Sequence, residues 1–334
     1  MIDHNFLVSI CIPTYNGEKF LIECLDSALD QTYTNIEILI VDDCSSDRTV
    51  KITESYLQKD KRIKIYKNTK NLGLVNNWNK CLQLSKGEYI KFAFQDDILL
   101  STCVEDLMLA VKGKKMAVCN REFIFENSVS DEKKNYYNQE LLTLQKLFDP
   151  KSSAFISNKK ISQFAAQHLS SNFIGEPTAV IFEKKLIDEV GYFNTNLNQI
   201  CDLEYWLRIS TVYGLVYVPK KLVKFRIHSE STTNHNLINN KSFADPIKLI
   251  HDFIYSPSFS KLRNFTGKFS QKKFEISLKA KLYEAYKSNN PNNHSKPEFL
   301  NVYFSNYPNL KIHFSDSIFT RILFKIILLK RKLS

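Results

Sequence analysis

The chain has 334 residues, of which 43% are hydrophobic and 24% are charged, a composition typical of a soluble globular protein and not of a disordered one. A chain of this length can bury a sizeable core, as one large domain or as two ordinary ones. Residues 1–235 carry equal numbers of basic and acidic side chains, whereas residues 236–334 carry 17 basic and 6 acidic ones. The whole net charge of +11 therefore belongs to the C-terminal part, which predicts an anionic partner there, a membrane surface and no nucleic acid.

Cysteine usage and hydropathy both favour a cytoplasmic protein. The seven cysteines are scattered without a CxxC pair, as expected of reduced, buried thiols and not of a disulfide framework or a zinc site. The N-terminus leads directly into a short apolar run, so we expect no signal peptide. We also expect no membrane-spanning helix, because no window approaches the ~20 apolar residues that such a helix needs.

The first hundred residues alternate between strand-like and helix-like patterns. Short apolar runs rich in β-branched residues predict buried strands at 6–12, 36–41, 62–66 and 88–94. Amphipathic spacing predicts helices between them at 18–30, from 47 to about 57 and at about 74–85. This alternation indicates an α/β fold with a doubly wound, mostly parallel sheet.

A polar cluster follows three of these strands, at 13–16, 42–47 and 95–97. Because the carboxyl ends of parallel strands lie along one edge of such a sheet, a nucleotide can lie across all three clusters. The adjacent acids Asp96 and Asp97 repel each other unless a cation lies between them, and a divalent metal on a diphosphate is the usual solution. A solvated turn is the alternative. The sequence has neither a GxGxxG nor a GxxxxGK[ST] loop, which argues against a dinucleotide dehydrogenase or a P-loop enzyme.

The rest of the chain is less regular. Apolar patterns predict strands at 115–125, 179–182, 215–219 and 222–227 and helices at 101–112, 184–190 and 202–208. We expect loops and one or two helices at 126–170, where a substrate-specific insertion is typical.

Two domains are predicted: a catalytic domain at 1–235 and a basic, mainly helical extension at 236–334. In the extension, residues 317–334 have the pattern of a basic amphipathic helix able to lie in a bilayer interface. Docking of this helix on the protein's own core is the alternative.

Five segments form a series of motifs in order: SICIPTYNG at 9–17, IVDDCSSDRT at 40–49, an N-x-G…N…G-E-Y-I run at 71–90, CDLEYWLR at 201–208 and FRIHSES at 225–231. The series, over roughly residues 6–232, resembles the family 2 glycosyltransferases, inverting enzymes that build bacterial surface polysaccharides. The resemblance implies a GT-A fold, a Rossmann-like sheet, here with a helical C-terminal extension. Cys44 stands where the family usually has Gly.

The resemblance implies that a nucleotide-sugar donor binds along the first three clusters. Pro13 and Tyr15 would seat the base with the Tyr15 ring near uracil, and Asp43 would accept a hydrogen bond from the uracil N3–H. A core aromatic is the alternative for Tyr15. The donor-binding residues implied in this way are Pro13, Tyr15, Asn16, Asp42, Asp43, Asn71, Gly73, Asn79 and Asp96. Asp96 would contact the ribose or hold the site together.

The metal motif departs from the family pattern, because Phe94 stands where the first acid of D-x-D-D is common. The resemblance implies that Asp97 and His228 bind Mg²⁺ or Mn²⁺, with weak or altered metal dependence left open. Arg226 would neutralise phosphate charge as the diphosphate leaves. A structural histidine is the alternative for His228.

Residues 202–208 resemble the [ED]-D-x-x-x-W-x-R motif, with Cys201 replacing the first acid. Asp202 would be the catalytic base, because inversion needs one carboxylate to deprotonate the attacking acceptor hydroxyl. Glu204 is the fallback base, and Glu176, Trp206 and Glu204 would lie on the acceptor side. Helix packing is the alternative for Trp206.

Together these implications predict an inverting glycosyltransferase of the hexosyltransferase type. Its donor would be a nucleotide-diphosphate sugar, UDP-linked for preference, and its acceptor a polyprenyl-diphosphate-linked or growing glycan of capsule, O-antigen or lipopolysaccharide. The basic extension would hold it peripherally on the inner face of the bacterial cytoplasmic membrane; a homodimer is left open. The alternatives are a nucleotidyltransferase, which would need a Gly-rich phosphate loop, and a non-catalytic binding or scaffold subunit, favoured by Phe94 and Cys201.

Overall fold

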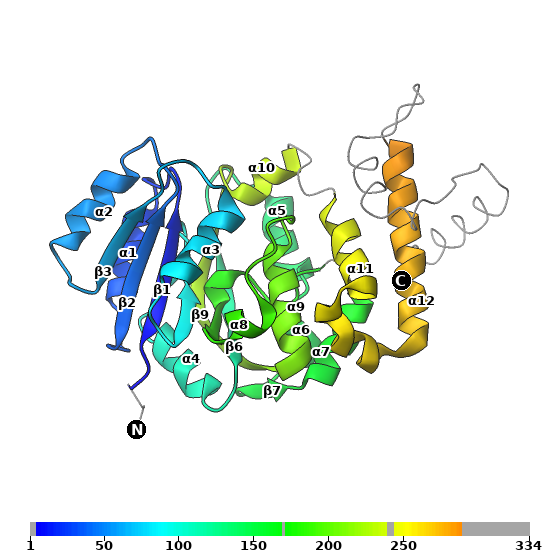
Figure 1. Cartoon of the computed structure of the whole chain (residues 1–334). Coiled ribbons are helices and arrows are strands. Elements are labelled where there is room, and N and C mark those ends of the chain that lie inside the picture. The colour runs from blue at the N-terminus through cyan, green and yellow to red at the C-terminus, as the bar shows by residue number, and fades with distance from the viewer. Residues whose placement is uncertain (1–4, 169–170, 239–243, 289–334) are drawn as a thin grey trace. The chain divides into compact units, whose positions relative to one another are not determined.

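A computed structural model describes residues 5–168, 171–238 and 244–288 (Figure 1). The chain divides into two compact units, Met1–Phe243 and Ala244–Ser334. The domain boundary expected after residue 235 stays a prediction, and the amphipathic helix expected at 317–334 lies outside the described residues. Among the helices that are described, none is long and apolar enough to cross a membrane.

Four parallel strands form one half of the sheet in the first unit, as the alternating pattern predicts. In space their order is β3 (Ile63–Lys67), β2 (Ile36–Asp42), β1 (Val8–Thr14) and β4 (Tyr89–Phe92). They are connected by helices α1 (Leu21–Leu29), α2 (Thr49–Leu57) and α3 (Leu74–Leu84). Every residue of β1 and β2 is buried, because both faces of a parallel sheet are covered, and this explains their continuous apolar runs.

The other half of the sheet is mixed. Strand β8 (Val180–Glu183) runs antiparallel to both β4 and β6 (Met116–Phe125), and β6 is parallel to β9 (Leu215–Ile227). Short strands β5 (Ile98–Leu99) and β7 (Ala154–Ile156) pair antiparallel with β9. The helices of this half include α4 (Cys103–Val111), α8 (Leu186–Val190), α9 (Cys201–Tyr213) and α10 (Thr232–Ile238).

Strand β9 is continuous where the sequence predicts two strands separated near Pro219. The register against β6 shifts at this point: Cys119 pairs with Val218, and Asn120 pairs with Lys221. Pro219 therefore falls in a bulge, where a proline costs the sheet no ladder hydrogen bond. The prediction of a break was wrong because a bulge absorbs the proline.

The segment at 126–170 is more helical than predicted. It contains α5 (Asp131–Asn135), a π-helical turn η1 (Tyr136–Glu140), α6 (Leu144–Phe148) and α7 (Asn158–Gln167). The three α-helices begin after Ser130, Thr143 and Ser157, whose hydroxyl oxygens each accept a hydrogen bond from the backbone amide three residues on. These N-caps are the sequence signal for the additional helices.

In the second unit, the described residues 244–288 form α11 (Asp245–Tyr255), a 3₁₀ turn η3 (Pro257–Phe259) and α12 (Ser260–Ser288), which contains a break at Gly267 (φ 70°). Its small core includes the buried rings of Phe253, Phe259 and Phe274, with centroids 4.8 and 5.8 Å from that of Phe253. Pro246 and Pro257 occupy first turns, where a proline is well tolerated.

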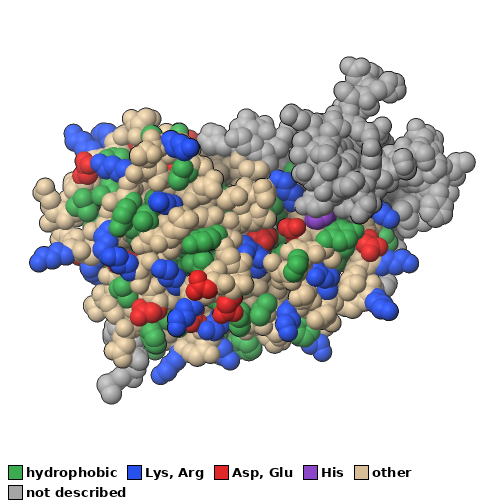
Figure 2. Space-filling model, in the orientation of Figure 1, with side chains coloured by type: hydrophobic (Ala, Val, Ile, Leu, Met, Phe, Trp, Pro, Cys, Tyr) green, Lys and Arg blue, Asp and Glu red, His purple; other side chains and the backbone are tan. Residues whose placement is uncertain are grey.

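Charge is spread over the first unit. On the face drawn in Figure 2, basic and acidic side chains are interspersed over this unit, in keeping with the equal numbers that residues 1–235 carry.

Gly87 provides a test of the contact between β4 and β1. A Cβ at this position would lie 2.5 Å from the Ser9 amide nitrogen and 2.7 Å from the Leu7 carbonyl oxygen. We expect Gly87→Ala to lower the free energy of unfolding by about 1–3 kcal/mol, because the backbone must move apart. Urea denaturation measures the loss, and Lys86→Ala, which trims an exposed side chain next to it, is the control. Equal stability of Gly87→Ala and the wild type would contradict this packing.

Candidate active site

The loops after β1 and β2 are locked together. The Asn16 amide donates to Ser45 Oγ (2.9 Å), and Asn16 Oδ1 accepts from the Ser46 amide (2.9 Å). The exposed Asn16 side chain therefore forms a hydrogen bond between the two loops. Asp42 is buried and accepts from the Thr14 hydroxyl (3.1 Å), whereas Tyr15 is 49% exposed, which does not fit the core-aromatic alternative. Pro13 is the second-to-last residue of the buried strand β1, where it pairs with Val41 of β2.

Cys44, which replaces a glycine of the family pattern, has a left-handed backbone with φ 65°. Glycine adopts this conformation without strain, so the structure explains why glycine is usual at this turn. The thiol is exposed.

Asp43 organises the loop that precedes α3. Its buried carboxylate accepts hydrogen bonds from the amides of Leu72 (2.7 Å) and Gly73 (2.9 Å) and from Asn68 Nδ2 (2.9 Å). Asn71 Nδ2 donates to the Asp43 carbonyl oxygen (3.2 Å). The structure thus brings together Asp43, Asn71 and Gly73, as the predicted donor site requires.

Asn79 on α3, which was also expected to bind the donor, makes a contact within the protein. Its side-chain amide exchanges two hydrogen bonds with the backbone of Phe193, at 3.0 and 2.9 Å. The pair holds α3 to the segment before α9, and the Asn79 amide is buried.

The two adjacent acids have different environments. Asp97 is only 1% exposed, and its carboxylate accepts from the Thr178 hydroxyl (2.5 Å) and from the Arg226 amide (3.0 Å). Burial raises the pKa of Asp97 well above its usual value, and the charge of Asp96 adds to the shift. Asp96 is partly exposed, and its Oδ2 lies 2.9 Å from His228 Nε2. Asp97 therefore connects parts of the chain, and Asp96 is the acid beside the histidine.

Arg226 lies in β9 and His228 directly follows this strand, and the two side chains make different contacts. The His228 ring packs edge-on against Phe20 (5.1 Å), and its buried Nδ1 has no hydrogen-bond partner in the described part of the chain. Arg226 donates from Nε to the Asp96 carbonyl oxygen (2.9 Å) and from Nη2 to Glu23 on α1 (2.8 Å). Glu23 thus takes part of the charge expected to face a phosphate.

Asp96 and His228 supply a carboxylate oxygen and an imidazole nitrogen, both of which are ligand types for divalent cations. In the structure these two atoms share a hydrogen bond of 2.9 Å. Within residues 5–168, 171–238 and 244–288, no group of three or more His, Cys, Asp or Glu is arranged to hold a metal ion. Further ligands would have to come from a bound diphosphate or water.

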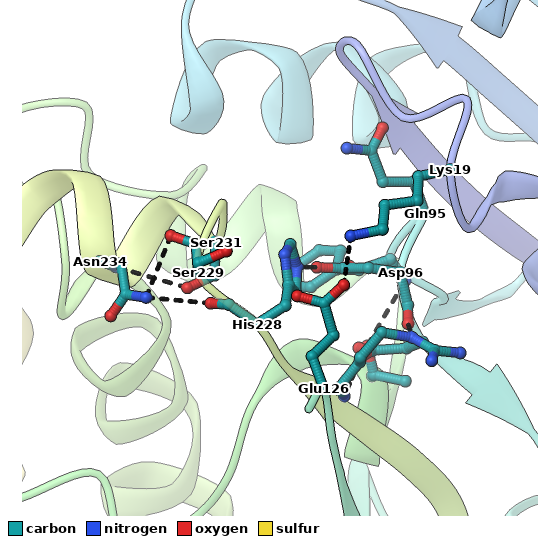
Figure 3. A network of polar contacts seen from close by, with 12 residues as sticks. Lys19, Gln95, Asp96, Glu126, His228, Ser229, Ser231 and Asn234 are labelled. Carbon is teal, nitrogen blue, oxygen red and sulfur yellow. Dashed lines mark hydrogen bonds and ion pairs between the residues drawn. The ribbon is translucent and has the colours of Figure 1, made fainter. Parts of the chain in front are cut away.

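Sequence reasoning missed an ion pair beside this histidine. Figure 3 shows Lys19 and Glu126 directed toward each other next to Asp96 and His228. Lys19 Nζ pairs with the Glu126 carboxylate and lowers its pKa. The two residues are 107 positions apart, so no local sequence motif predicts their contact.

Asp202 begins α9 and is 8% exposed. Its carboxylate accepts from Asn172 Nδ2 (2.7 Å) and from the Leu203 amide (2.7 Å). Burial raises the pKa of Asp202 from 3.8 to about 7; the Leu203 amide opposes the shift and the charge of Glu176 adds to it. A carboxylate with this pKa can accept a proton at neutral pH.

The segment before β8 joins this base to the paired acids. Glu176 forms an ion pair with the buried Arg121 (2.6 Å), and it raises the pKa of both Asp202 and Asp97 by its charge. Thr178, in the 3₁₀ turn η2 (Pro177–Ala179), donates to Asp97. Glu176 therefore lies within electrostatic reach of both parts of the site.

Two residues expected on the acceptor side lie in the core. Trp206 is 0% exposed and donates from Nε1 to the Gly175 carbonyl oxygen (3.1 Å). Glu204 is buried and paired with Arg208 (2.7 Å), so it is not available as a fallback base. An acceptor contact by Trp206 does not fit this burial; helix packing, the stated alternative, does.

Comparisons with known proteins identify the family of the chain. The model of the family "Glycosyl transferase family 2" matches residues 9–172. An uncharacterized glycosyltransferase from Rickettsia prowazekii is 30% identical over 243 residues, which cover 72% of this chain and 70% of the relative. Glycosyltransferase GlyG from Streptococcus pneumoniae is 30% identical over 198 residues, covering 56% and 60%.

Solved structures share the fold. Residues 1–349 of Staphylococcus aureus TarS in complex with UDP give a TM-score of 0.57 at 17% identity, over 89% of this chain and 78% of that one. This chain spans only 44% of a longer TarS chain. The mannosyltransferase PcManGT from Pyrobaculum calidifontis, in complex with GDP-Man and Mn²⁺, gives 0.55 at 16% identity over 93% and 83%. The GT-A fold predicted from the sequence is confirmed.

Substitutions of Trp206 test whether this residue packs in the core or contacts the acceptor. We expect Trp206→Ala to lower the free energy of unfolding by about 3–5 kcal/mol, because it empties a packed aromatic site. Trp206→Phe, which keeps a ring among Phe182, Phe193 and Tyr205, should cost less. Chemical denaturation measures both. An alanine variant with wild-type stability and weaker acceptor binding would contradict the core assignment.

Proposed function

The chain belongs to glycosyl transferase family 2, and we propose that this glycosyltransferase moves a sugar, with inversion, from a UDP-linked donor to a hydroxyl of a lipid-linked or growing glycan. The observation that carries the proposal is the buried carboxylate of Asp202, whose pKa of about 7 suits a base at neutral pH. Inversion needs a single base on the acceptor side, and we assign this role to Asp202.

The nucleotide lies across the loops after β1 and β2. The exposed ring of Tyr15 supports stacking on the base. Asp43 supports recognition of the uracil N3–H, since a carboxylate oxygen accepts more than one hydrogen bond and Oδ2 accepts one from Gly73. Crystals of TarS residues 1–349 with UDP and with UDP-GlcNAc make a uridine nucleotide the first donor to test.

Asp96 and His228 would hold Mg²⁺ or Mn²⁺ in this proposal, and such an ion would supply positive charge for the leaving diphosphate. This assignment replaces Asp97 by Asp96, because Asp97 is only 1% exposed whereas Asp96 is partly exposed and lies beside His228. Arg226 assists through its backbone position, since its guanidinium is held by Glu23.

Asp202 takes the proton of the acceptor hydroxyl as that oxygen attacks the anomeric carbon. Asn172 orients the carboxylate through its 2.7 Å hydrogen bond. Burial keeps the pKa of Asp202 high, the charge of Glu176 adds to the shift, and Arg121, which pairs with Glu176, opposes it. A base of higher pKa binds the transferred proton more strongly, which favours the attack.

The proposed acceptor class and cellular location are based on the positive charge of the C-terminal part of the chain. The excess of basic residues at 236–334 supports peripheral contact with the anionic inner face of a cytoplasmic membrane, where lipid-linked glycans are displayed. Synthesis of a cell-surface polysaccharide is the process that joins such an acceptor to a family 2 enzyme.

Asp202→Asn tests the base. With a panel of UDP-sugars and Mn²⁺, UDP release should fall by about 10²- to 10⁴-fold in the variant. In the wild type kcat/KM should rise with pH and level off above about 7, because only ionised Asp202 accepts the proton. Asp188→Asn, at an exposed position of α8, is the control. Full activity of Asp202→Asn would refute the base, and absence of turnover or binding with every donor would refute the enzyme proposed.

Asp96→Ala and Asp97→Ala form a matched pair for the cation. In titration calorimetry with UDP present, Asp96→Ala should weaken Mn²⁺ binding by at least about tenfold, the smallest loss usual even for outer residues of metal sites. Asp97→Ala should instead lower the free energy of unfolding by about 1–3 kcal/mol, since it leaves buried donors unpaired. A folded Asp97→Ala variant that loses Mn²⁺ while Asp96→Ala keeps it would contradict the assignment.

A further inference from the structure

An ion pair that the proposed mechanism does not explain lies beside Asp96 and His228 (Figure 3). Lys19 lies between β1 and α1, and its ammonium pairs with Glu126, the first residue after β6. The Lys19 side chain is 52% exposed, and its Nζ lies 4.9 Å from the centroid of the Phe20 ring. The ammonium is thus held in place and still reaches solvent.

The position of Glu126 brings this pair to the predicted diphosphate site. The Glu126 amide donates to the carbonyl oxygen of Ile227 (3.1 Å), the residue before His228. The pKa of Glu126 is lowered first by Lys19 and also by His228, so the carboxylate lies within electrostatic reach of the ring. In Figure 3, Lys19 and Glu126 face each other beside Asp96 and His228.

The loop that carries Lys19 is fixed from two sides. Gln95 accepts from the Tyr15 amide (2.9 Å) and donates to the Tyr15 carbonyl oxygen (3.1 Å). The Gly17 amide donates to Thr49 Oγ1 (2.8 Å), and a Cβ at Gly17 would lie 2.2 Å from Gln95 Oε1. Because Gln95 directly precedes Asp96, the same residue positions the loop of Lys19 and the acid of the cation site.

The charged side chains around Lys19 indicate a role for its ammonium in binding an anion. Asp96 and Glu126 are acids, and the guanidinium of Arg226 is held by Glu23. Phe94 has replaced the common acid, and its ring stacks on Trp78 (4.9 Å), so it offers a cation no ligand. Besides the proposed cation, Lys19 offers a diphosphate positive charge on a fixed loop, from a side chain that is half exposed.

We infer that Lys19 binds the diphosphate of the donor and neutralises part of the charge that develops there as the sugar leaves. This inference rests on the proposed function. Glu126 is a positioning residue that holds the ammonium at the site before the donor arrives. When the donor binds, a phosphate oxygen replaces or joins the Glu126 carboxylate as the partner of Lys19.

Calorimetric titration of UDP and of uridine, each with and without Mn²⁺, tests the inference on the full chain. Lys19→Met should weaken UDP binding by about tenfold or more, because a charge-assisted bond to phosphate is lost, and should leave uridine binding unchanged. The loss should be greater without Mn²⁺, when Lys19 carries more of the charge. Glu126→Gln should bind UDP as tightly as the wild type or more tightly. Lys51→Met, at an exposed position of α2, is the control and should match the wild type.

Equal UDP affinity of Lys19→Met and the wild type would overturn the inference while leaving the proposed function intact. An equal loss of UDP and uridine binding would also overturn it, because it would show that Lys19 only shapes the loop. A wild type that binds neither ligand would overturn the proposed uridine donor itself, and with it this inference.

Discussion

The buried carboxylate of Asp97 joins three parts of the chain that are distant in sequence. One oxygen accepts from the Thr178 hydroxyl and the other from the Arg226 amide, so the end of β4 is tied to the turn before β8 and to the end of β9. Residues next to these contacts form the proposed cation site: Asp96 precedes Asp97, and His228 follows Arg226 by two positions. The separation of 2.9 Å between Asp96 and His228 therefore depends on a carboxylate that has itself almost no exposure.

The same turn extends the arrangement to the base. Glu176 stands two residues before Thr178, pairs with Arg121 and raises the pKa of Asp202. The acid that would accept the proton and the pair that would hold the cation are thus positioned by one short segment. A displacement of this segment would change the geometry at the cation and the pKa of the base together, which couples the two halves of the proposed reaction.

Much of this was accessible from the sequence because β1–β4 and the clusters after them follow from local periodicity. Local pattern could not tell Asp96 from Asp97, because both lie where a strand ends and alternation no longer fixes the direction of a side chain. For Trp206 the family resemblance implied an acceptor contact, but α9 is buried on all sides and the burial of Trp206 fits the helix-packing alternative. The pair of Lys19 and Glu126 was invisible, because only the tertiary fold brings residues 107 positions apart together.

The most direct measurement is the anomalous scattering of Mn²⁺ in crystals of the full chain soaked with UDP and Mn²⁺. The account predicts a peak within coordination distance of Asp96 Oδ2 and His228 Nε2, with diphosphate oxygens completing the coordination and the uracil at Asp43. A peak on Asp97, or UDP bound without contact to Asp43 and His228, would contradict it.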